Sequence, residues 1–88
     1  MEELFDIGEA LKRLKDGRLV QRIGWNGKGM WLIYVPEERW STSVGPINCA
    51  PRAHRLPWVG MKTADDGLVP WLCSQTDLLA TDWREVTL

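Results

Sequence analysis

The chain has 88 residues, of which 44% are hydrophobic and 26% charged, and its formal net charge is −1. This length predicts one domain over residues 1–88, and the charge lacks the positive excess of proteins that bind a nucleic-acid polymer. No apolar run approaches the ~20 residues of a membrane span. Neither a nucleic-acid polymer nor a membrane is therefore an expected partner.

The first predicted element is a helix that begins after Asp6 and ends before Gly17. Asp6, with Glu9 three residues later, has the pattern of a capping box, and Gly17 suits the position just after a helix. Apolar residues at helical spacing predict the packed face: Ile7, Ala10, Leu11 and Leu14. The basic residues of the helix are expected to face outward: Lys12, Arg13 and Lys15.

Two strands are predicted next, over residues 18–23 and 30–35. Between them, Asn26-Gly27 is a favoured pair for the turn of a hairpin. The segment "GWNGKGMW", residues 24–31, is thus predicted to connect two antiparallel strands, with a tryptophan on either side of the turn.

Residues 36–57 are predicted to form a long excursion with little regular structure, apart from a short strand over residues 40–44. Strands are then expected at residues 58–62 and 68–71, joined by a turn at Asp66-Gly67. Pro70 suggests that the second of these strands lies at a sheet edge.

The C-terminal part is predicted to hold a short helix and a last strand. Ser74 and Asp77 resemble a capping box, Leu78 and Leu79 would supply the packing face of the helix, and the strand covers residues 82–86. The fold class is therefore α+β, a small antiparallel sheet of about four to six strands with one N-terminal helix and a short C-terminal helix.

Residues for catalysis are sparse. His54 is the single histidine, and the neighbouring cations Arg52 and Arg55 hinder its protonation. Ser74 with Asp77 is explained better as a helix cap than as acid–base machinery. Cys49 and Cys73 form no framework, and no spacing typical of a metal site occurs, so neither a metal nor a cofactor is expected.

The hairpin connection is the first candidate binding site. Trp25 and Trp31 offer flat platforms, Met30 is an adaptable filler, Gly29 allows close approach of backbone N–H groups, and Lys28 adds positive charge. A base stacked on an aromatic ring contributes about 1–3 kcal/mol. These features suit a small nucleotide; the alternative is a hairpin whose tryptophans belong to the core. Six tryptophans in so short a chain favour an indole-lined surface.

The start of the second helix is the other candidate. Ser74 and Thr76 offer hydroxyls and Gln75 an amide, all able to bond ribose hydroxyls or base edges. Asp77 disfavours a phosphate at this position but suits a ribose diol or an adenine amino group. The alternative is a capped surface helix.

Three motifs in order, "GEALKRLKDGRLVQRIGWNGKGMW", "MKTADDGLVPW" and "SQTDLLATDW", resemble a small phage domain family associated with the second class of Thoeris anti-defence proteins. The resemblance covers residues 7–86. It is weakest at residues 36–58, where relatives often have a tyrosine-rich stretch and this chain has "INCAPRAHRLPW".

The resemblance implies a non-enzymatic sponge in the cytoplasm of the infected bacterium. Members of that family capture glycosyl-cyclic ADP-ribose, the Thoeris signal, without cleaving it, and some take up cyclic dinucleotides. They work as homotetramers with pockets at subunit contacts. The alternatives are a sponge for cyclic dinucleotides, an enzyme that degrades the signal, and a non-catalytic phage protein-interaction module.

The motif match carries over a set of expected ligand-binding positions. These are Trp25, Asn26, Lys28, Gly29, Met30, Trp31, Met61, Thr63, Trp71, Ser74, Gln75, Thr76, Asp77 and Asp82.

Overall fold

The computed structural model describes residues 2–25, 29–40 and 54–88. Its elements are α1 (Ile7–Lys15), β1 (Leu19–Arg22), β2 (Trp31–Val35), η1 (Glu37–Arg39), β3 (Trp58–Lys62), β4 (Leu68–Pro70), α2 (Gln75–Leu78) and β5 (Trp83–Val86). The strands form one antiparallel sheet in the order β4-β3-β2-β1-β5. The α+β fold class is confirmed. The predicted Asn26-Gly27 turn, Cys49 and residues 41–44 lie outside the described residues.

Helix α1 begins and ends where the sequence predicts. Asp6 Oδ1 accepts the backbone N–H of Glu9 at 3.0 Å. Gly17 follows the helix with φ of 87°, in the left-handed region that glycine adopts without a Cβ clash. The Glu9 carboxylate accepts from Arg13 Nε at 2.9 Å, so this residue supports the helix through an i,i+4 ion pair.

Two predictions about the faces of α1 are wrong. Leu11 is 38% exposed, because the sheet meets the helix along the line of Ala10 and Leu14, which are both fully buried. Arg13 does not simply face outward: its guanidinium lies 4.2 Å from the ring centre of Phe5, and it pairs with acidic groups from three segments, Glu3, Glu9 and Glu85. Glu3 and Glu85, which lie outside the helix, therefore help to set the direction of the Arg13 side chain.

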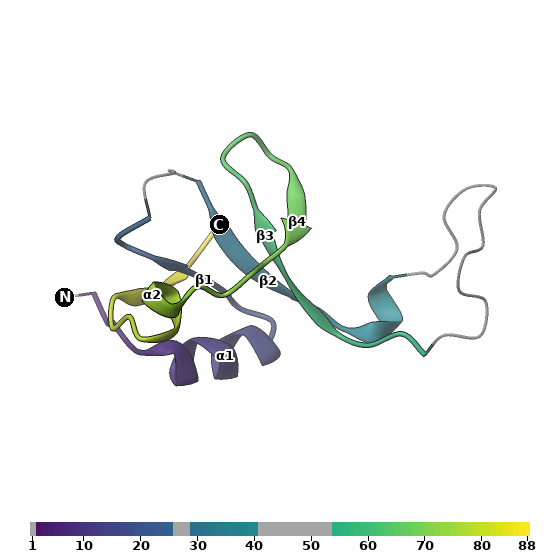
Figure 1. Cartoon of the computed structure of the whole chain (residues 1–88), viewed down its shortest axis with the longest axis horizontal. Coiled ribbons are helices and arrows are strands. Elements are labelled where there is room, and N and C mark those ends of the chain that lie inside the picture. Colours follow the sequence, from purple (N-terminus) through teal and green to yellow (C-terminus); the bar gives the residue numbers. More distant parts are fainter. Residues whose placement is uncertain (1, 26–28, 41–53) are drawn as a thin grey trace.

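The predicted hairpin pairs β1 with β2, with Val20 opposite Leu32. Strands β2 and β3 lie side by side along their whole length, with Trp31 opposite Lys62 at one end (Figure 1). Strand β4 is an edge strand, as Pro70 suggested. At the far end of β2 and β3, Trp40 Nε1 donates to the Leu56 carbonyl at 2.9 Å, so the two described ends of the excursion are held together.

The sheet has two unlike faces. Helix α1 packs on one of them, and the core there consists of fully buried residues: Ala10, Leu14, Val20, Leu32 and Trp83. Cross-strand partners share a face and successive residues alternate. Trp31 and Lys62, which pair with each other, therefore lie on the face opposite the buried Leu32. We call this second surface the open face.

Helix α2 packs differently from the prediction. Leu78 and Leu79 are 45% and 74% exposed, so they do not form its packing face. Asp77 faces inward instead, with a relative exposure of 9%. The Ser74 cap is confirmed, because Ser74 Oγ accepts the backbone N–H of Asp77 at 3.0 Å.

Candidate functional site

A buried tryptophan organises the site. Trp83 is fully buried, and the rings of Trp25 and Trp71 both meet it nearly edge-on. The centroid distances are 5.3 Å and 5.9 Å, with interplanar angles of 82° and 86°. Such pairs contribute about 0.5–1.5 kcal/mol beyond area burial. Both partly buried indoles are therefore fixed against the core.

Asp77 receives hydrogen bonds from two of these indoles and from an arginine. Its Oδ1 accepts from Trp25 Nε1 at 3.1 Å and from Arg22 Nη1 at 2.8 Å, and its backbone carbonyl accepts from Trp83 Nε1 at 3.2 Å. Burial on its own would raise the pKa of Asp77, but the bonds from Arg22 and Trp25 outweigh it and hold the pKa below its ordinary value. Asp77 is thus an ionised, internally bonded carboxylate.

Asp82 occupies the other side of the same arginine. Its Oδ1 accepts from Arg22 Nε at 2.8 Å, and its Oδ2 accepts the backbone N–H of Gly24 at 2.9 Å. The bond from Arg22 lowers the pKa of Asp82, and the two carboxylates raise the pKa of Arg22. We refer to Arg22, Asp77 and Asp82 as the arginine clamp. It joins the end of β1 to α2 and to the start of β5.

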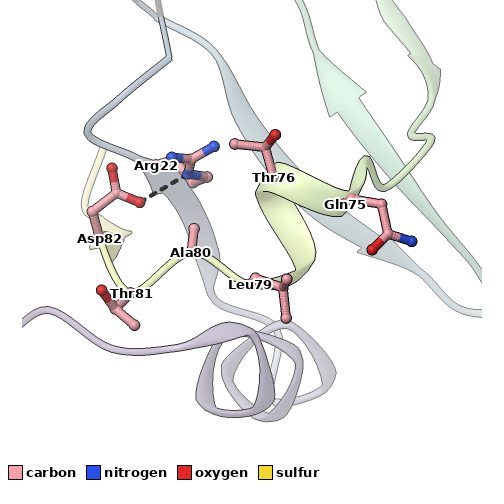
Figure 2. Close-up of a pocket in the computed structure, with 7 residues that line it drawn as sticks. All are labelled: Arg22, Gln75, Thr76, Leu79, Ala80, Thr81 and Asp82. Atoms are coloured by element: carbon pink, nitrogen blue, oxygen red, sulfur yellow. Dashed lines mark hydrogen bonds and ion pairs between the residues drawn. The ribbon is translucent and has the colours of Figure 1, made fainter.

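A groove of about 540 Å³ opens beside the arginine clamp. Its lining comes from the end of β1, from α2 and from the segment that follows α2: Arg22, Gln75, Thr76, Leu79, Ala80, Thr81 and Asp82. In Figure 2, Arg22 lies between Asp82 and Thr76, and the dashed line joins it to Asp82. The groove is shallow and open to solvent, and it presents hydroxyl, amide and carboxylate groups on a surface that is mostly apolar.

The structure brings one part of the predicted set together at this groove. Gln75, Thr76 and Asp82 line it. Asp77 does not line the groove but bonds to Arg22, which does. Asp77 also bonds to Trp25 and Ser74, and Trp71 packs against Trp83. These residues form one site on the side of the sheet that α1 covers.

Another part of the set lies on the open face at the same end of the sheet. Lys62 Nζ lies 4.4 Å from the ring centre of Trp31 and donates to the Gly29 carbonyl at 2.7 Å. The main-chain carbonyl of Met30 accepts from Gln21 Nε2 at 2.7 Å. Within one chain, Trp31 and the groove are therefore on opposite faces of the sheet.

Two of the remaining predicted positions, Met61 and Thr63, make contacts that stabilise the fold. Met61 packs against the core. Thr63 Oγ1 accepts the backbone N–H of Gly67 at 2.8 Å within the turn between β3 and β4. Asn26 and Lys28 lie outside the described residues, and the structure places neither of them.

Sequence reasoning missed Arg22, although a signal for it was present. Val20 faces the core, and Arg22 stands two residues further along the same strand. Because side chains alternate along a strand, a cation at that position must face the core side and needs an acidic partner there. Asp77 and Asp82, which the motif match had singled out, are those partners.

The described residues carry neither a metal-binding cluster nor a membrane-spanning helix. Within them, no group of three or more His, Cys, Asp or Glu side chains could hold a metal ion. In the same ranges, no helix reaches the length and apolarity needed to span a bilayer.

Comparison with known proteins places the chain in a family. A family model described as Tad2-like, Thoeris anti-defense 2-like domain, matches residues 5–86. The chain is also 39% identical over 92 residues to a protein named Thoeris anti-defense 2 from Bacillus phage SP01, and the match covers 99% of this chain and 100% of that relative. The family is named for counteracting a defence system and not for an enzymatic activity. The chain belongs to the Thoeris anti-defense 2 family.

Proposed function

We propose that this protein is a phage anti-defence sponge that captures glycosyl-cyclic ADP-ribose in the cytoplasm of the infected bacterium and holds it uncleaved. Membership of the Thoeris anti-defense 2 family supports the anti-defence role. The observation that carries the capture itself is the groove beside the arginine clamp: hydroxyl, amide and carboxylate groups line it, and the Trp25 indole donates to Asp77 of the clamp.

The groove suits the sugar and base of such a ligand. Its volume of about 540 Å³ lies within the ~300–1,000 Å³ of pockets that hold small molecules. The hydroxyls of Thr76 and Thr81 and the amide of Gln75 can bond ribose hydroxyls and base edges. The carboxylate of Asp82 can accept from a hydroxyl or an amino group.

The phosphates need positive charge from another place. Lys62 lies on the open face, beside Gly29 and over Trp31. Its ammonium also pairs with Asp66 at 2.9 Å, but the Asp66 side chain is 85% exposed, so a phosphate next to a base stacked near Trp31 could displace this carboxylate. Because this pair and the groove lie on opposite faces of one chain, a ligand that uses both requires a second subunit.

We therefore propose that the protein is a homotetramer whose pockets lie at subunit contacts. The open face supports this arrangement. Trp31, Ile33 and Trp58 are only partly buried there, and Leu68 is 54% exposed. Clusters of partly exposed indole and aliphatic side chains are typical of surfaces that meet another chain.

The ionisation of the site supports capture without cleavage. Despite the burial of Asp77, the bonds from Arg22 lower the pKa values of Asp77 and Asp82, so both carboxylates are charged at neutral pH, which excludes a general acid, and both are weakened as general bases. His54 precedes β3 at the end where Trp58 pairs with Val35, and the groove lies at the opposite end of the sheet. This placement argues against a hydrolase that degrades the same signal.

A sponge must compete with the signal's own receptor. A nanomolar dissociation constant corresponds to about −12 kcal/mol. Such a value is reached when a pocket is preformed, because little side-chain ordering remains for the binding step. The edge-on contacts of Trp25 and Trp71 with Trp83, together with the arginine clamp, supply that order in the free protein.

A thermal-shift screen tests this proposal. The unfolding midpoint is measured with glycosyl-cyclic ADP-ribose, with a panel of cyclic dinucleotides and with linear ADP-ribose as the matched control. A ligand that binds the native state at 100 times its dissociation constant stabilises it by about 2.7 kcal/mol. We expect glycosyl-cyclic ADP-ribose to raise the midpoint most. A larger shift with cyclic dinucleotides supports the alternative sponge, and no shift with any nucleotide supports the interaction module.

A further inference from the structure

The arginine in the groove is already neutralised by carboxylates of its own chain. Arg22 donates Nε to Asp82 and Nη1 to Asp77, both at 2.8 Å. The side chains of Arg22 and Asp77 are only 15% and 12% exposed. One cation against two anions leaves a net charge of −1. An arginine that lines a nucleotide pocket ordinarily suggests a phosphate contact, but a phosphate at this position would meet a net negative group.

The arginine clamp is also closely enclosed by the main chain. The N–H of Gly24 donates to Asp82 Oδ2 at 2.9 Å. A Cβ added to Gly24 would lie 3.0 Å from that oxygen and 3.1 Å from Arg22 Nη2, which is closer than ordinary contact. The backbone of residue 24 therefore lies directly against the guanidinium, and the next residue is Trp25.

We propose that Arg22 is a positioning residue and not a phosphate ligand. By holding Asp77 and Asp82 in place, its guanidinium fixes the Trp25 indole behind the groove and the Asp82 carboxylate at its edge. The groove then takes the uncharged part of the nucleotide, which bears hydroxyl and amino groups, and the phosphates lie outside it. This assignment rests on the proposed function for the identity of the ligand.

The geometry requires a guanidinium at this position. The two carboxylates come from separate segments, at sequence distances of 55 and 60 residues from Arg22. A planar fork can donate to both at once from different nitrogens, whereas a lysine ammonium is a single point charge. A phosphate contact would not require a guanidinium at residue 22, because lysine also binds phosphate well.

Three variants separate positioning from phosphate contact: Arg22→Lys, Arg22→Gln and Asp82→Asn. Asn has a single acceptor oxygen, whereas Asp82 accepts from both Arg22 and Gly24, so Asp82→Asn breaks one of these bonds while it removes a negative charge. Asp16→Asn is the matched control, because Asp16 is an exposed carboxylate at the end of α1. Far-UV circular dichroism establishes that each variant is folded.

The first readout is capture of glycosyl-cyclic ADP-ribose by calorimetry. If Arg22 positions the site, both Arg22 variants weaken capture about tenfold or more, which is about 1.4 kcal/mol. Asp82→Asn then weakens capture as well, and Asp16→Asn leaves it unchanged. Tighter capture by Asp82→Asn, together with near-normal capture by Arg22→Lys, overturns the proposal, because both results belong to direct phosphate binding.

The second readout is the near-UV circular dichroism of the coupled indoles, which needs no ligand. Release of Asp77 frees the N–H of Trp25 and loosens its edge-on contact with Trp83. We expect Arg22→Gln to reduce the signal and Asp16→Asn to preserve it. A wild-type spectrum for folded Arg22→Gln overturns the proposal. If the wild-type protein captures no nucleotide, the proposed function fails, and these spectra still decide the role of Arg22.

Discussion

Trp83 donates its indole N–H to the main-chain carbonyl of Asp77 over 3.2 Å, and it is fully buried at the centre of the core. This bond ties a helix of only four residues to the sheet. The same residue meets Trp25 and Trp71 edge-on. The stability of the fold and the shape of the groove therefore depend on one side chain.

Removal of Trp83 should therefore destabilise the whole protein. We expect Trp83→Ala to lower the free energy of unfolding by about 3–5 kcal/mol, because a large buried side chain is replaced by a cavity. Urea denaturation measures the change. Trp40→Ala is the control, because Trp40 lies beyond the sheet and bonds to Leu56. A loss at Trp83 no larger than that at Trp40 would contradict the central place of Trp83.

The open face contains one glycine that its neighbours require. A Cβ on Gly60 would lie 2.9 Å from both Trp58 Cζ3 and Leu68 Cδ1. We expect Gly60→Ala to destabilise the fold by about 1–3 kcal/mol through overpacking. The loss should shrink in a Trp58→Ala background, because one of the two close contacts is then removed. Equal losses in both backgrounds in a double-mutant cycle would show that Trp58 does not cover Gly60.

The arginine clamp should make stability sensitive to acid. Asp77 and Asp82 have pKa values lowered from the ordinary 3.8, so the folded state binds fewer protons than the unfolded state as the pH falls. Their contribution is present above pH ~4 and is lost as the pH falls through the folded-state values. Urea midpoints measured from pH 7 to pH 2 should show the drop. Arg22→Gln should reduce the dependence of the urea midpoint on pH. An unchanged dependence in that variant would contradict this explanation.

The proposed assembly predicts that two defective chains can complement each other in one oligomer. Trp31→Ala impairs the open face and Thr76→Val impairs the groove, and each variant alone should capture little signal. If one subunit supplies Trp31 and another supplies the groove, random mixed assembly leaves about a quarter of the pockets intact. Capture capacity of co-expressed chains, compared with each variant alone, measures this recovery. No recovery would mean that the pocket does not combine these residues from different subunits.

The local features of the fold could be predicted from sequence because they depend on neighbouring residues. Asp6 and Gly17 bound the first helix, Ser74 caps the second, and Pro70 marks the edge strand. The misassigned residues depend on distant partners. The sequence predicts Leu79 on the packing face of α2, but Asp77 takes the inward position because Arg22 and Trp25 bond to it from the N-terminal part of the chain.

The candidate site was predicted in part for the same reason. The motif match grouped Thr76 and Trp31 as neighbours of one ligand, since linear motifs carry no information on sheet faces. Only the register, in which Trp31 pairs with Lys62 beside the buried Leu32, separates the two. The alternation of side chains along β1 indicates that Arg22 faces the core and needs an acidic partner, but only the structure shows that Asp77 and Asp82 both pair with it.

The most direct test of the sponge is a capture-and-release measurement. Glycosyl-cyclic ADP-ribose is mixed with excess protein, the free ligand is measured after filtration, and the retained fraction is heated to denature the protein before mass spectrometry. We predict that free ligand disappears and that intact ligand returns on heating. Persistence of free ligand, or recovery of a ring-opened or hydrolysed product, would contradict it.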